Sequence, residues 1–221
     1  MFYLKINRVR IKNTDTPMLF PHSKGPVIDM LSIASTDVTG GLDVESWLSE
    51  TDANKRTQLH AAVGQAAVVP IMSTQLIYNT NASIVFGDTG YVVFNHQDIP
   101  ENINWIFLAI KSNERRRQLW GSVQQELSEQ RSDKLIEQAI TAFSLNPAAA
   151  FGLAVCGLLA RIIVKKLAAE PDEILGMSSQ SFIRVRDYPY GERTRDGVPD
   201  TSGNMLLDYS LFGFNENSIQ R

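Results

Sequence analysis

The chain has 221 residues, of which 43% are hydrophobic and 20% are charged, and its formal net charge is −3. A chain of this length and apolar content buries a substantial core, which excludes disorder over most of its length. The slight negative charge provides no broad basic field, so we do not expect nucleic acid as a partner.

The N-terminal ten residues alternate apolar and polar positions and carry charge by Lys5. They therefore lack the uninterrupted apolar core of a secretory signal, and a cytoplasmic location is the default expectation. A single cysteine, Cys156, lies within an apolar stretch. It cannot form an intrachain disulfide, and we interpret it as a small hydrophobic residue.

The N-terminal quarter of the chain indicates two strands followed by a helix. Alternation from Phe2 to Lys12 shifts phase near Asn7 and Arg8, which predicts one strand with a bulge. Val27 to Ser35 predicts a second strand. Apolar residues then recur at helical spacing after a capping box that begins at Ser49, so we expect a helix that ends before Pro70.

Short β-branched and aromatic segments separated by turn residues fill the centre of the chain. They predict four strands: Ile71–Tyr78, Ala82–Phe86, Tyr91–Asn95 and Ile103–Lys111. The last segment is apolar almost without a break, so we expect it to be covered on both faces. Two further strands, at Ser178–Arg186 and Met205–Phe214, flank a polar stretch from Asp187 to Asn204 that we interpret as a long loop.

Between these two groups of strands, helical periodicity predicts three helices over residues 113–170. The sequence thus predicts a mainly β protein with a single domain. Its antiparallel β-sandwich is formed by residues 1–112 and 171–221, and the helical block 113–170 is an insertion. One additional helix precedes the central strands.

The third predicted helix, over residues 147–170, contains a run of seventeen residues with one charge, Arg161. Small residues recur along one side and bulky ones along another, which suits a helix buried between its partners and the sheet. Ridges of small residues also drive helix association in lipid, so membrane insertion is the alternative. The run is shorter than the ~20 residues that span a bilayer, and we expect no stable transmembrane anchor.

The segment Pro171-Asp172-Glu173-Ile174-Leu175-Gly176 resembles the Asp-Asp-aliphatic-Leu-Gly step that opens a strand in C2-type β-sandwiches, after their third calcium loop. The preceding strand of those domains ends in Asp-x-Asp, where this chain has Ser112 and Glu114. Residues 13–17 follow the first strand, where C2 domains place their first calcium loop. The resemblance implies a C2-like sandwich with the helices inserted into the third loop.

The same resemblance implies a metal site formed by Asp15, Glu114 and Asp172, with calcium as the only cofactor. Calcium prefers six to eight oxygen ligands, several of them from carboxylates. This chain offers three acids and has a serine where the family pattern has an aspartate. The alternative is that these acids serve as turn and cap residues and that the protein holds no cofactor.

Arginine and tyrosine residues form a second group of binding candidates. They are Arg115, Arg116 and Arg117 in the first inserted helix, and Arg186, Tyr188, Tyr190 and Arg193 near or within the polar stretch. Such residues bind phosphate groups, carboxylates or protein partners. The alternative is a solvated surface whose charges pair among themselves.

Catalytic motifs are absent from the sequence. The three histidines, His22, His60 and His96, lack metal-ligand spacing, and no Gly-x-Ser-x-Gly motif occurs. Asp88-Thr89-Gly90 matches an aspartic protease motif but has no second copy, and a hairpin turn uses the same residues. We therefore do not expect an enzyme.

The sequence predicts a non-catalytic binding module that docks on a membrane surface or a protein partner, with calcium as an assisting ion. The alternative is a membrane-active effector, toxin-like or pore-forming, that uses the apolar helix 147–170. Self-association into a homo-oligomer is a further use of the helices that the sequence leaves open.

Overall fold

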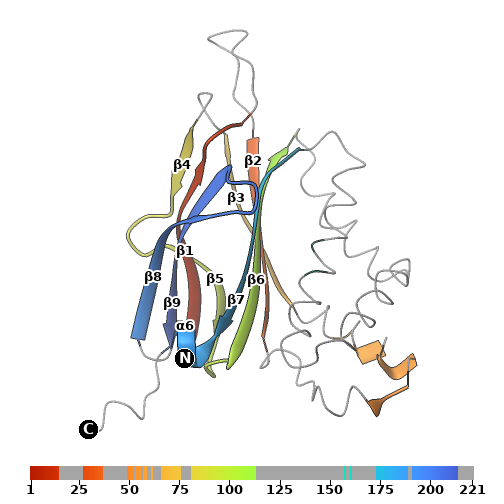
Figure 1. Cartoon of the computed structure of the whole chain (residues 1–221). Coiled ribbons are helices and arrows are strands. Elements are labelled where there is room, and N and C mark those ends of the chain that lie inside the picture. Colours follow the sequence, from red (N-terminus) through yellow and green to blue (C-terminus); the bar gives the residue numbers. More distant parts are fainter. Residues whose placement is uncertain are drawn as a thin grey trace.

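A computed structural model of the chain describes residues 1–14, 27–36, 49–51, 53–55, 57–58, 61, 66–75, 81–112, 157, 160, 173–188 and 191–213. The fold is mainly β, and two antiparallel sheets pack face to face as in a β-sandwich (Figure 1). This confirms the predicted fold class at that level. The C2 type and the three-helix insertion stay predictions.

The first sheet has the strand order β4-β1-β9-β8, and β5 also pairs with β1. Its strands are β1 (Phe2–Ile11), β4 (Ala82–Val85), β5 (Tyr91–His96), β8 (Gly191–Pro199) and β9 (Met205–Gly213). β5 pairs with the first half of β1 and β4 with the second half, so the two lie in series along one side of β1. The register between β1 and β9 shifts between Ile6 and Arg8, which confirms the predicted bulge.

The second sheet has the order β3-β2-β6-β7. Its strands are β2 (Val27–Thr36), β3 (Ala67–Gln75), β6 (Asn102–Ser112) and β7 (Glu173–Ile183). Every residue of β6 from Ile103 to Ile110 is buried, which confirms that this strand is covered on both faces.

Alternate residues of both sheets form the core between them, because side chains along a strand point to opposite faces. Trp105 of β6 is the largest of these side chains, and its ring lies 5.2 Å from that of Tyr209 in an edge-on arrangement. The indole Nε1 donates a hydrogen bond of 2.8 Å to Ser32 Oγ, so its polar atom is satisfied inside the core.

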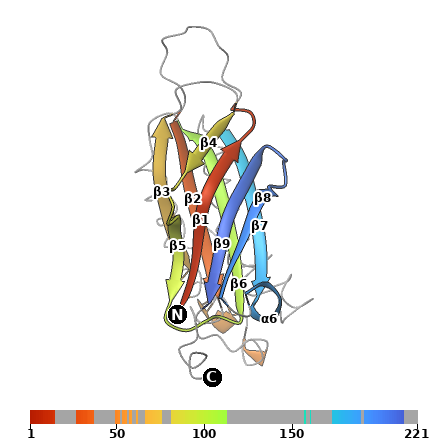
Figure 2. The same ribbon diagram turned by 90° about the vertical axis from the view of Figure 1, so that its left-hand side faces the viewer.

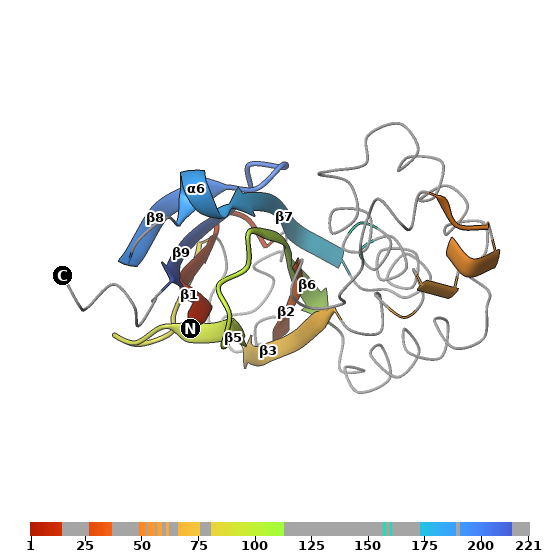
Figure 3. The ribbon, with the colours of Figure 1, turned by 90° about the horizontal axis from the view of Figure 1, so that it is seen from below.

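Each sheet ends in an edge strand on either side of the sandwich. Seen from below, β7 and β8 lie on one side, with α6 (Arg184–Asp187) beside them, and β3 and β5 lie on the other (Figure 3). α6 and the N-terminus lie at the same end of the sandwich (Figure 2). The side with β7, β8 and α6 carries the candidate site.

Two predicted boundaries differ from the structure, and both belong to edge strands. β3 begins at Ala67, before Pro70 rather than after it, and Pro70 lies opposite Leu31 within the ladder. A proline is tolerated there because an edge strand has a free side that needs no N–H donor. β7 begins at Glu173, and its predicted last residues, 184–186, form the single helical turn α6 instead.

The interpretation of Asp187–Asn204 as a loop is wrong. Gly191–Pro199 forms β8 and pairs with β9 from Gly191↔Gly213 to Pro199↔Leu206. Most of β8 is exposed and four of its nine residues are charged, which is how edge strands avoid pairing with other chains. Its polar composition therefore concealed a strand.

The predicted helices fall largely outside the described residues. Around the capping box, residue 49 and residues 53–55, 57–58 and 61 are helical. Within 147–170 the structure describes Gly157 and Ala160, which are both helical, and Ala160 is buried. None of the described helical segments has the length and hydropathy that a membrane crossing requires.

Candidate functional site

A cleft of about 290 Å³ lies between the edge strands β7 and β8, next to α6. It is lined by Gln180, Ser181, Phe182, Arg186, Asp187, Arg195, Val198, Tyr209 and Leu211. The lining therefore combines an apolar part, contributed mainly by core side chains of β7 and β9, with two arginines and one aspartate. Such a mixture suits a ligand that has both an apolar and a charged part.

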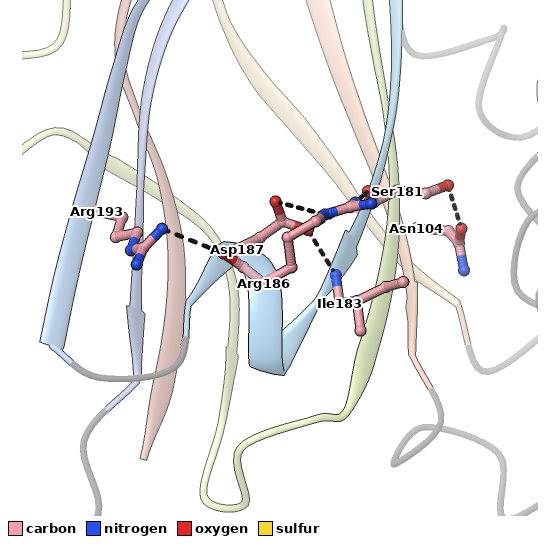
Figure 4. Close-up of polar contacts among 6 residues, drawn as sticks. All are labelled: Asn104, Ser181, Ile183, Arg186, Asp187 and Arg193. Carbon is pink, nitrogen blue, oxygen red and sulfur yellow. Dashed lines mark hydrogen bonds and ion pairs between the residues drawn. The ribbon is translucent and has the colours of Figure 1, made fainter.

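The chain turns sharply at the end of β7, and Asp187 closes this turn. The Ile183 amide donates a hydrogen bond of 2.8 Å to the Asp187 carboxylate, four residues ahead in the chain (Figure 4). The backbone N–H of Arg184 donates to the carbonyl oxygen of Glu101 at 2.8 Å, and the guanidinium of Arg184 pairs with the Glu101 carboxylate at 2.7 Å. These bonds fix α6 against the loop that precedes β6.

Arg186 and Asp187 form a multiply bonded ion pair at the mouth of the cleft. Arg186 Nε and Nη2 donate to Asp187 Oδ2 at 3.0 and 2.8 Å, and Nη2 also donates to the carbonyl oxygen of Ser181 at 3.3 Å (Figure 4). Burial raises the pKa of Asp187. Hydrogen bonds from Arg186 and the Ile183 amide, with the charges of Arg186 and Arg195, outweigh it, so the net pKa is lowered.

Arg195 contributes a second positive charge from β8. It lies directly opposite Tyr209 in the β8–β9 ladder. Among the residues that the structure describes, no carboxylate oxygen lies within 4.0 Å of its guanidinium, although Asp187 is near enough to act on it electrostatically. Arg195 is thus less completely paired than Arg186.

Tyr209 is 3% exposed and lines the same cleft. No hydrogen-bond partner of its hydroxyl occurs among the described residues. Burial raises its pKa, the charge of Arg195 lowers it, and Asp187 raises it, with a net increase. The hydroxyl therefore remains protonated at neutral pH and can donate a hydrogen bond.

The predicted binding residues have different positions. Arg186 lines the cleft, and Arg193 donates to the carbonyl oxygen of Arg186 at 3.1 Å (Figure 4). Tyr188, in contrast, is fully buried in the core, where its ring lies 4.9 Å from that of Phe2 and its hydroxyl donates to Pro100 O at 2.8 Å. Its role is therefore in packing, because a fully buried side chain offers no surface to a partner.

The other predicted site residues lie outside the described residues. They are the calcium candidates Asp15, Glu114 and Asp172, and the binding candidates Arg115, Arg116, Arg117 and Tyr190. The described residues include no group of three or more His, Cys, Asp or Glu side chains arranged to hold a metal ion. The calcium site therefore stays a prediction.

Asp88-Thr89-Gly90 forms part of the turn between β4 and β5. The φ angles of Gly87 and Gly90, +72° and +70°, lie in the left-handed region that glycine favours. The motif thus lies in a turn, as expected, but the turn is not that of a hairpin, because β4 and β5 both pair with β1, one after the other, and not with each other.

Comparisons with protein-family models, curated proteins and solved structures find no match for the chain.

Proposed function

We propose that the chain is a non-catalytic binding module that docks on a protein partner through the α6 end of its sandwich. The observation that supports this is an exposed apolar pair at α6. Val185 is 77% exposed and Ile183 is 41% exposed. Apolar side chains next to arginines are typical of the centres of protein interfaces.

The charges at α6 favour a protein over an anionic membrane. The two arginines that flank Val185 are already paired, Arg184 with Glu101 at 2.7 Å and Arg186 with Asp187 at 2.8 Å. A surface that recognises anionic lipid normally presents a cluster of uncompensated cations, each adding about 1 kcal/mol of attraction. Compared with such a cluster, the paired arginines of α6 attract anionic lipid less strongly, and their hydrogen bonds are more directional.

The chemistry of the cleft favours binding over catalysis. A general base needs an available lone pair within reach of a substrate proton. Both oxygens of Asp187 accept hydrogen bonds from Arg186, and Oδ2 also accepts one from the Ile183 amide. The lowered pKa of Asp187 makes it a weaker base still. The calcium-assisted and membrane-active alternatives depend on residues outside the described part of the chain.

The test compares two substitutions of exposed valines. Val185→Glu changes the docking surface, and Val85→Glu changes a valine that is 60% exposed on β4, far from α6 in the sequence. Immobilised wild-type chain, V185E and V85E are compared for proteins retained from a lysate of the source cells. We expect a partner that the wild type and V85E retain and V185E loses at least tenfold.

Liposome flotation with anionic vesicles forms the second arm, with and without calcium and followed by dye leakage. If the wild-type chain floats with the vesicles and V185E does not, the partner of this surface is a membrane and not a protein. Leakage would instead support the membrane-active alternative. Equal retention of every protein by all three chains would contradict docking through α6.

A further inference from the structure

We propose that the cleft between β7 and β8 is a binding site for a small oxyanion carried on an apolar group, with Arg195 as the charge partner and the Tyr209 hydroxyl as a second donor. This goes beyond docking through α6, because it concerns a small group held between the sheets. A carboxylate or a phosphate group has the required chemistry.

The charges of the cleft lining favour an anion. Arg186 and Arg195 contribute two positive charges and Asp187 one negative charge, so the net charge of the lining is +1. Asp187 accepts its hydrogen bonds from Arg186 and from the Ile183 amide. Arg195 is therefore the cation of the cleft that has no carboxylate within 4.0 Å among the described residues. An oxyanion would complete its pairing and could accept two parallel N–H bonds from the guanidinium.

Tyr209 offers a second donor to a ligand in the cleft. Its hydroxyl is not among the buried unsatisfied polar atoms of the described residues, so it reaches the solvent in the cleft and is available to a ligand. Tyr209 is 3% exposed, it lines the cleft, and its hydroxyl has no hydrogen-bond partner among the residues described. Because it lies opposite Arg195 in the ladder, a single oxyanion can reach both groups.

The size and the apolar part of the lining define the rest of the ligand. About 290 Å³ is close to the lower end of ligand pockets, roughly 300 Å³, so the ligand is small. Phe182, Val198 and Leu211 form the apolar lining. A ring or short hydrocarbon attached to the anionic group would bury its surface there, which a bare inorganic ion cannot do.

The experiment is a ¹⁵N NMR titration of the full-length chain with four small molecules, three that contain a ring and one that does not. Phenylacetate and phenyl phosphate carry an oxyanion on a ring, phenylacetamide is the neutral match, and acetate lacks the ring. We expect both ring anions to shift the Arg195 Nε–H signal and the amides of Ser181 and Phe182. We expect phenylacetamide and acetate to bind at least tenfold more weakly.

Three variants locate the site. Arg195→Gln should weaken binding of the ring anions at least tenfold, and Tyr209→Phe about threefold. Lys5→Gln, which removes a positive charge on β1 outside the cleft lining, should stay within twofold of the wild type. The spectrum of each variant also reports whether it is folded.

The relative affinities of phenylacetate and phenyl phosphate identify the source of the oxyanion, and either preference supports the site. The proposal is overturned if neither ring anion shifts these signals in the wild type, or if R195Q binds them as tightly as the wild type does. Because no protein partner enters the titration, its failure leaves docking through α6 untouched.

Discussion

Two clusters of this sandwich each combine one aspartate with two arginines, and they differ in how completely the charges pair. On the outer face of the first sheet, Asp208 Oδ1 lies 2.6 Å from Arg10 Nη2, and Oδ2 lies 3.3 Å from Arg8 Nε. Asp208 Oδ1 also accepts the Gly197 amide at 2.6 Å. Every member of this cluster therefore has a partner within the fold.

In the cleft, Asp187 binds Arg186 and the Ile183 amide, whereas Arg195 acts on it only from a longer distance. The two clusters thus have the same residue types with different consequences. The charges around Asp208 pair with one another and serve the fold, although Arg10 Nε is buried without a hydrogen-bond partner among the described residues. The cleft retains one cation and one tyrosine hydroxyl that a ligand can satisfy, which is what a binding site requires.

The largest effect is expected from Asp208→Ala. Removal of this carboxylate leaves Arg8, Arg10 and the Gly197 amide without their acceptor, and we expect a loss of about 3 kcal/mol in the free energy of unfolding. Urea denaturation measures it. Asp98→Ala, at a side chain that is 82% exposed, is the control and should stay within about 0.5 kcal/mol. A loss as small as that of the control would show that the Asp208 cluster is not structural.

A third aspartate, Asp200, also has a charge that is satisfied within the fold, and the pH dependence of stability tests this. Asp200 accepts hydrogen bonds from the amides of Met177 and Met205, at 3.0 and 3.1 Å, and from Ser202 Oγ at 2.7 Å. Burial raises its pKa, but these bonds outweigh burial and lower it overall. The ionised form is therefore favoured by folding, and its contribution is fully present above the ordinary carboxyl pKa.

That contribution is lost as the pH falls through the lowered pKa of Asp200. Asp200→Asn should cost about 2 kcal/mol at pH 7, because the amide nitrogen cannot accept a hydrogen bond. The difference between wild type and D200N should narrow below about pH 4. Urea denaturation at a series of pH values measures the gap. An equal gap at pH 7 and pH 3 would contradict the role of the charge.

Much of the fold follows from apolar alternation, and the exceptions are edge strands. β1 and its bulge near Asn7 are readable because their inward residues are apolar and the phase shift is local. In β8 the residues that face the cleft include Arg195, so its alternation is between polar residues and carries no apolar signal. An edge strand needs polar residues to remain soluble, and the pattern that protects it also hides it.

The candidate site was predictable only in part for a related reason. Arg186 borders the polar stretch from Asp187 to Asn204, which stands out in the sequence. Tyr209 lies in an apolar strand, where it looks like any other core aromatic. It meets Arg195 only through the pairing of β8 with β9, and that pairing cannot be inferred when β8 itself is not recognised. Contacts between distant segments are what the sequence leaves undetermined.

Asp187→Asn should have a smaller effect than either previous change. Asparagine retains an oxygen that can accept the Ile183 amide, and Arg186 is 64% exposed, so water replaces much of the lost ion pair. We expect a loss of about 1 kcal/mol or less. A double-mutant cycle with Arg186→Gln measures the coupling directly. A coupling as large as the loss expected for Asp208→Ala would place this pair in the same class as the Asp208 cluster.

The smallest effect on stability, and the sharpest test of the comparison, is expected from Arg195→Gln. Because no described carboxylate lies within 4.0 Å of Arg195, its removal should change the free energy of unfolding by less than about 0.5 kcal/mol. Arg10→Gln is the matched control and should cost about 1 kcal/mol, since it breaks the 2.6 Å pair with Asp208. If R195Q and R10Q lose the same free energy of unfolding in urea denaturation, Arg195 stabilises the fold as much as Arg10 does. If R195Q is stable but no longer binds ring anions, the two clusters differ in function. Replacing arginine by glutamine would then weaken the fold at Arg10 and ligand binding at Arg195.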